Sequence, residues 1–90
     1  MTILIIEDDE RVASFLKRGL EAEGYGVQLS RDGVSGLAHA AQKDCRLIIL
    51  DLQLPGKQGL DVCRELRSGG NRTPVLMLTA RDTLGDKVSG

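Results

Sequence analysis

The chain has 90 residues, which is enough for one small domain with a single modest core. Its 12 basic and 13 acidic side chains nearly cancel and it has only two aromatic residues, which argues against a nucleic-acid surface and excludes a base-stacking platform. No run approaches the roughly 20 apolar residues of a membrane span, and the two cysteines lack the spacing of a disulfide framework or a zinc site.

The N-terminal third of the chain shows a strand, a helix and a second strand. Residues 3–6 form a short aliphatic run typical of a strand that is buried on both faces. The next apolar residues have helical spacing and form one stripe: Val12, Phe15, Leu16, Gly19 and Leu20. Gly24 is predicted to end this helix in a left-handed conformation. Residues 27–30 then alternate between apolar and polar, as in a strand with one more exposed face.

The same alternation continues through the middle of the chain. Asp32 is predicted to cap a second helix. The expected apolar stripe of that helix is Val34, Leu37, Ala38 and Ala41. Residues 47–50 are a third, continuously apolar strand, and Asp51 follows directly after it. Cys45 is expected in the loop before this strand, and His39 on the surface.

The remaining residues complete one more unit. Pro55-Gly56 indicates a turn. A third helical stripe follows: Gly59, Val62, Cys63 and Leu66. Residues 69–71 end that helix, 75–79 form a fourth strand, and 81–90 are expected to be a loop and the start of another helix. This order predicts an α/β domain with a parallel sheet and helices on both of its faces.

Acidic residues follow two of the predicted strands. Glu7, Asp8 and Asp9 follow the first, Asp51 follows the third, and Thr79 ends the fourth. Ligands of open α/β sheets bind beyond the carboxyl ends of the strands. If the first and third strands are neighbours, as in the order 2-1-3-4, Asp8 and Asp51 converge, and a cation such as Mg²⁺ would compensate their charges.

A carboxylate in such a cluster can also react. Asp51 could attack a phosphoryl group and form an acyl phosphate, with the Thr79 hydroxyl bonded to a phosphoryl oxygen and the small Ala80 leaving space. The competing interpretation is that the acids are solvated loop residues or helix caps, with Asp8 or Asp9 capping the first helix. Acids at two strand ends and a threonine at a third favour the functional interpretation.

Three segments resemble a bacterial response-regulator receiver domain of the OmpR/PhoB type. They are residues 3–9 (ILIIEDD), 51–60 (DLQLPGKQGL) and 78–81 (LTAR), in the family's order and spacing, and the resemblance covers the entire chain. It implies a flavodoxin-like, doubly wound parallel sheet with the strand order 2-1-3-4.

The resemblance also implies roles for particular residues. Asp51 would accept a phosphoryl group from the phosphohistidine of a sensor histidine kinase. Thr79 would be the switch hydroxyl and Ala80 the small residue beside it. The resemblance implies a Mg²⁺ site formed by Glu7, Asp8, Asp51 and the backbone carbonyl of Gln53. The domain would assist its own phosphorylation without being an enzyme in the turnover sense.

The resemblance departs from the family at the far end. Family members continue into a fifth strand, with a phosphoryl-binding lysine near it, and a fifth helix; Lys87 does not match that lysine. We therefore expect residues 1–90 to be a receiver domain that is incomplete at its C-terminus. The longer regulator would bind DNA through a separate C-terminal domain. We expect a cytoplasmic protein without membrane contact, and a homodimer or a strand-exchanged dimer, because the fourth strand would expose an edge.

Two other functions compete with the switch. One is a truncated receiver that no longer switches and acts only as a binding or dimerisation module. The other is a Mg²⁺-dependent phosphatase of the haloacid dehalogenase type, which places a second aspartate two residues after its nucleophile. Gln53 occupies that position here and disfavours the phosphatase.

Overall fold

A computed structural model describes residues 1–42, 44–55 and 57–78 of the chain. Its elements alternate between strands and helices: β1 (Thr2–Ile6), α1 (Glu10–Ala22), β2 (Gly26–Ser30), α2 (Gly33–Ala40), β3 (Cys45–Asp51), α3 (Gly59–Ser68) and β4 (Val75–Leu78). The strands form one parallel sheet in the order β2-β1-β3-β4. The predicted α/β class and strand order are therefore confirmed. The expectations for Gly56, Thr79, Ala80 and 81–90 lie outside the described residues.

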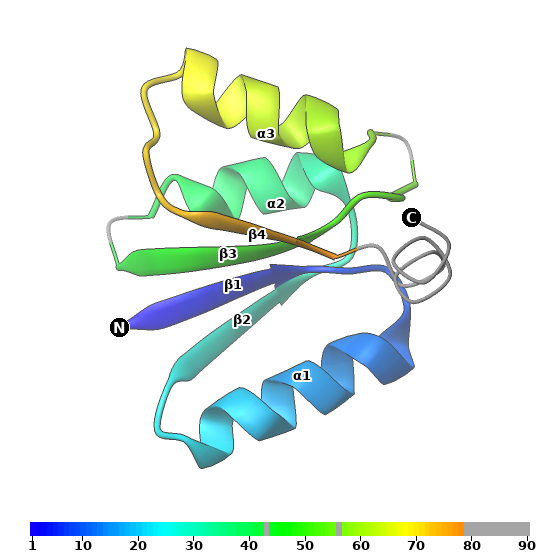
Figure 1. The fold of residues 1–90 in the computed structure, drawn as a ribbon, viewed down its shortest axis with the longest axis vertical. Helices are drawn as coiled ribbons and strands as arrows, with labels where there is room; N and C mark the ends of the chain where they lie inside the picture. The colour runs from blue at the N-terminus through cyan, green and yellow to red at the C-terminus, as the bar shows by residue number, and fades with distance from the viewer. Residues whose placement is uncertain (43, 56, 79–90) are drawn as a thin grey trace, which may run out of the picture.

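The sheet forms the middle of three layers. α1 covers one face, and α2 and α3 cover the other (Figure 1). Because successive side chains of a strand point to opposite faces, Ile3 and Ile5 of β1 pack on the α1 side, whereas Leu4 and Ile6 join the core under α2 and α3. Both faces of β1 are thus buried from Ile3 to Ile6, which explains why these four residues are all apolar.

Local signals set the ends of the helices. The side chain of Asp32 caps α2 by accepting a hydrogen bond from the Ser35 backbone N–H at 2.8 Å. Gly24, just beyond α1, has a φ of +96°, and its N–H donates to the Glu21 carbonyl at 3.0 Å. The predicted cap at Asp32 and the left-handed stop at Gly24 are confirmed.

The buried stripe of α1 differs from the predicted one. Phe15 is 75% exposed, whereas Ala13 is 5% exposed and Leu16 packs on the sheet. At 100° per residue, Phe15 lies about 120° from the centre of the stripe formed by Val12, Ala13, Leu16 and Leu20. Regular spacing placed Phe15 at the margin of the predicted stripe, whereas in the structure the helix packs on the sheet with Ala13 on its buried side.

α2 is also rotated from its predicted orientation. Val34 is 69% exposed and Ala38 is exposed, while Gly33, Gly36 and Ala40 are buried. A Cβ on Gly36 would lie 2.5 Å from the Ile6 Cδ1 atom. The helix therefore approaches the sheet through its glycines, a contact that an apolar periodicity does not reveal.

Two single-residue predictions were wrong. Cys45 belongs to β3 instead of the preceding loop and is buried, which raises the pKa of its thiol. His39 is half-buried instead of exposed, with its Nδ1 atom 2.6 Å from the hydroxyl of buried Ser30. No helix among the described residues has the length and apolar character needed to cross a membrane.

Candidate metal centre at the carboxyl edge of the sheet

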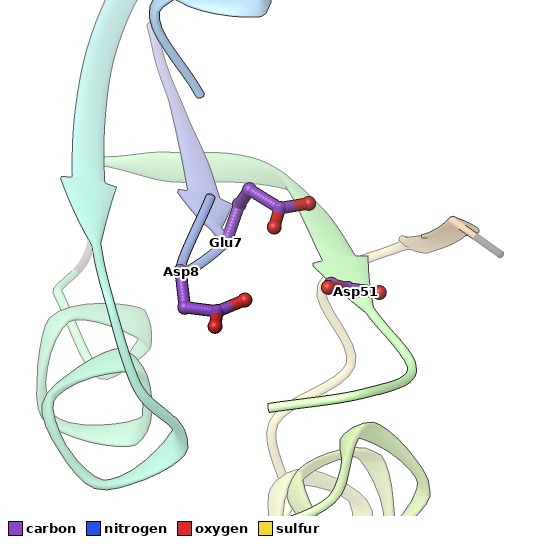
Figure 2. Close-up of side chains that lie close together, drawn as sticks. All are labelled: Glu7, Asp8 and Asp51. Carbon is purple, nitrogen blue, oxygen red and sulfur yellow. The ribbon is translucent and has the colours of Figure 1, made fainter. Parts of the chain in front are cut away.

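The carboxyl ends of the two central strands bring three acidic side chains together. β1 and β3 are neighbours, and Ile6 of β1 pairs with Leu50 of β3. Glu7 and Asp51 are the next residues of the two chain segments and therefore lie at the same edge of the sheet. Asp8 completes the group, and one carboxylate oxygen of each residue lies within 4.8 Å of the others (Figure 2). The expected convergence of Asp8 and Asp51 is present.

Glu7 is the buried member of this cluster. Its side chain is only 6% exposed, its N–H donates to the Ser30 carbonyl at 2.9 Å, and its Oε2 accepts the Asp9 N–H at 2.9 Å. The pKa of Glu7 is raised to about 7, mainly by burial and to a smaller extent by Asp51 and Asp8, against the lowering effect of the Asp9 hydrogen bond. The cluster is thus strained electrostatically unless a proton or a cation neutralises it.

Asp51 is half-buried at the last position of β3. Its Oδ1 accepts the Gln53 N–H at 3.2 Å, which fixes the carboxylate against the loop that leads to α3. Gln53 itself is exposed. The carboxyl group of Asp51 is therefore held in place while part of it faces solvent.

Gly59 lets α3 begin directly against the end of β3. Its N–H donates to the Leu52 carbonyl at 2.9 Å, and an added Cβ would clash with the Asp51 carbonyl oxygen and lie 2.8 Å from the Leu52 Cα. The sequence interpretation counted Gly59 as part of an apolar stripe and of the segment 51–60 that carries the resemblance, and did not predict this close approach. A glycine eight residues beyond an acidic strand end was the available signal of this close approach.

Asp9 does not join the cluster. Its Oδ1 accepts the N–H groups of Arg11 at 2.9 Å and Val12 at 3.4 Å, so it caps α1. The alternative that an acidic residue of this triplet is a helix cap is therefore correct for Asp9. Asp8 is exposed and lies in the cluster instead.

A shallow cavity of about 280 Å³ lies beside the cluster, between α1 and the end of β2. Glu7 lines it together with Glu10, Ala13, Ser14, Leu29 and Arg31. Arg31 pairs with Glu10 at 3.0 Å. Sequence reasoning did not identify this cavity, because its lining comes from segments that share no motif.

The donor set fits a hard divalent cation. All three groups offer carboxylate oxygen, neither cysteine nor histidine belongs to the group, and the three oxygens are close enough for one ion to reach them directly or through water. Glu7, Asp8 and Asp51 are thus the residues that could hold Mg²⁺, an ion that keeps several waters and needs only one or two carboxylates.

Comparisons with known proteins agree on one family. The family model described as "Response regulator receiver domain" matches residues 3–90. The chain is 49% identical over 88 residues to the transcriptional regulatory protein YkoG of Bacillus subtilis, covering 98% of this chain and 39% of that protein. The chain therefore spans about two fifths of that relative's length.

Solved structures are similar along most of the chain. The receiver domain of the sensor histidine kinase PA1611 from Pseudomonas aeruginosa, solved with magnesium in its active-site cleft, matches with a TM-score of 0.83 and 31% identity over 97% of this chain and 73% of that one. A complex of the histidine kinase ThkA with the response regulator TrrA matches with a TM-score of 0.80 and 32% identity over 88% of this chain and 68% of that one.

Proposed function

The chain belongs to the response regulator receiver domain family, and on that premise we propose that Asp51 accepts a phosphoryl group from the phosphohistidine of a sensor histidine kinase in a Mg²⁺-dependent reaction. As a two-component receiver domain, it is a phosphoacceptor and not a turnover enzyme. The observation that carries the proposal is the convergence of the Glu7, Asp8 and Asp51 oxygens within 4.8 Å of one another at the carboxyl edge of the sheet.

The three carboxylates differ in ways that favour Asp51 as the nucleophile. Glu7 is nearly inaccessible to a phosphoryl donor, and because burial beside two other acids raises its pKa to about 7, its ionised form would be stabilised by a cation. Asp51 is half-buried, ends a rigid strand and is held by the Gln53 N–H. Asp8 is exposed beyond β1 and suits direct contact with the ion.

The proposed phosphoryl transfer is a single substitution at the phosphorus atom. An Asp51 carboxylate oxygen forms the new P–O bond, the P–N bond of the phosphohistidine breaks, and the imidazole nitrogen keeps that electron pair. Bound Mg²⁺ would offset the negative charge of the transferring oxygens. Glu7 and Asp8 would hold the ion, together with Asp51 and the backbone carbonyl of Gln53.

Thr79 and Ala80 are proposed to convert phosphorylation into a change of surface. Leu78 pairs in register with Asp51, and Thr79 and Ala80 are the next residues of the sequence. We propose that the Thr79 hydroxyl donates a hydrogen bond to a phosphoryl oxygen and that the small Ala80 leaves room for the phosphoryl group. New charge at Asp51 would thereby bias the domain between two states.

The partners follow from this assignment. A sensor histidine kinase is the proposed donor, and the ThkA–TrrA complex supports that choice because it joins a histidine kinase to a response regulator. Residues 1–90 are proposed to be the receiver part of a longer cytoplasmic regulator that forms homodimers and binds DNA through another domain. The name of YkoG as a transcriptional regulatory protein supports the proposed role in transcription.

Intact-mass spectrometry tests the proposal. The chain is incubated with acetyl phosphate and Mg²⁺, beside Asp51→Asn and, as a matched control, Asp61→Asn, which removes an exposed carboxylate on α3. We expect one added phosphoryl group in the chain and in Asp61→Asn, and none in Asp51→Asn or with a chelator. Phosphorylation that persists in Asp51→Asn would refute the assignment.

A further inference from the structure

Asp9 connects the start of α1 to the acidic cluster. We propose that Asp9 is a positioning residue for the cation site: by capping α1 it holds its own backbone N–H against the Glu7 carboxylate, and so orients Glu7 and Asp8. The inference rests on the proposed function, because Mg²⁺ is taken as the ion.

The backbone of Asp9 is held by bonds on both sides. Its side chain accepts from Arg11 at 2.9 Å and Val12 at 3.4 Å, and its carbonyl accepts the Ala13 N–H at 2.9 Å as the first bond of the helix. With φ at −80° and ψ at 113°, the residue has the extended conformation of a capping position. The direction of its N–H is therefore fixed, and this N–H donates a hydrogen bond to the Glu7 Oε2 atom at 2.9 Å.

This bond closes a short loop around Asp8. Glu7 and Asp9 flank Asp8, and the Asp9 N–H joins the two flanking residues. Asp8 is exposed, and among the described residues its side chain makes no hydrogen bond that would orient it. The backbone on either side is thus what sets its direction, and Asp9 fixes that backbone from the helix side.

The cap also keeps a fourth carboxylate out of the cluster. The group that can share a cation consists of Glu7, Asp8 and Asp51, although Asp9 is adjacent in sequence. Because the helix N–H groups hold the Asp9 carboxylate, its charge is directed to the positive end of α1. We expect loss of the side-chain cap to loosen the backbone at residue 9 and so weaken its N–H bond to Glu7.

The test separates capping from charge. Asp9→Ala removes the cap, whereas Asp9→Asn and Asp9→Ser remove the charge and retain a capping oxygen. Asp32→Ala is the matched control, because Asp32 caps α2 in the same way, through Ser35 at 2.8 Å, without contact with the cluster. Each cap loss costs about 1 kcal/mol of stability, so circular dichroism first verifies that each variant is folded.

The main readout is the Mg²⁺ dissociation constant, measured by isothermal titration calorimetry on the 90-residue chain. We expect Asp9→Ala to weaken Mg²⁺ about tenfold, as for residues that orient metal ligands. Asp9→Asn, Asp9→Ser and Asp32→Ala are expected to stay within about twofold of the unmodified chain. Equal affinities for Asp9→Ala and Asp32→Ala would overturn the proposal, and so would an equal loss in Asp9→Asn, which would assign the effect to charge.

A second readout needs no metal. In chelator, hydrogen exchange of the residue-9 amide should accelerate in Asp9→Ala and stay slow in Asp9→Asn and Asp9→Ser; unchanged exchange in Asp9→Ala overturns the positioning role. Phosphorylation of Asp51 is measured separately. If Asp51 is not phosphorylated but the order of Mg²⁺ affinities holds, the positioning role stands and the phosphoacceptor function fails.

Discussion

Replacement of Glu7 by glutamine should change how the stability of the fold depends on pH. Glutamine keeps the shape of the side chain and an oxygen that can accept the Asp9 N–H, but it carries no charge. In the folded chain the pKa of Glu7 is raised from 4.5 to about 7, mainly by burial. The folded state therefore binds this proton more tightly than the unfolded state does.

The sign and the size of the effect follow from this difference. Below pH 4.5 the group is protonated in both states and costs nothing. Between pH 4.5 and about 7 the unfolded state releases the proton first, so the free energy of unfolding falls as pH rises. At about 1.4 kcal/mol per pH unit the loss reaches about 3 kcal/mol above pH 7. Glu7→Gln should thus be more stable than the unmodified chain by up to about that amount at pH 8, in chelator.

Urea unfolding at intervals from pH 4.5 to 8 measures the difference between the two proteins. Glu10→Gln is the matched control, because Glu10 begins the next helix and its side chain is 76% exposed. We expect that control to change stability by less than about 0.5 kcal/mol at every pH. Saturating Mg²⁺ should reduce or reverse the advantage of Glu7→Gln at pH 8, because the ion stabilises the ionised carboxylate. A difference that does not vary with pH would refute the reasoning.

Three further predictions concern packing and the cation. Gly36→Ala should destabilise the fold by about 1–3 kcal/mol in urea unfolding, because its Cβ meets Ile6, whereas Gly19→Ala, with nothing within 4 Å, should stabilise it by up to about 1 kcal/mol. Saturation with Mg²⁺ at about 100 times its dissociation constant should raise the free energy of unfolding by about 2.7 kcal/mol, and Asp8→Asn should remove most of that gain in the same assay. Phe15→Glu should change stability by less than about 0.5 kcal/mol in thermal or urea unfolding, because Phe15 is 75% exposed. A loss above about 2 kcal/mol would show that the ring is buried in the core and contradict this prediction.

Short-range interactions made much of this fold predictable from the sequence. A run such as residues 3–6 can be buried on both faces only in a central parallel strand, which is where it lies. The cap at Asp32 and the stop at Gly24 are short-range effects, so they hold in almost any tertiary context. The acidic residues at the ends of the strands were likewise recognisable from the sequence, before the pairing of those strands was known.

Interactions across the fold set the remaining features, because they depend on distance and burial. The raised pKa of Glu7 depends mainly on its burial in the folded chain, and to a smaller extent on Asp51, which the pairing of β1 with β3 brings to the same edge. Regular helical spacing could not show that α2 would approach through Gly36 or that α1 would leave Phe15 in solvent, because the width and rotation of a buried stripe depend on the surface it meets. Periodicity specifies which elements form, and the packing of one element on another decides which faces and which charges meet.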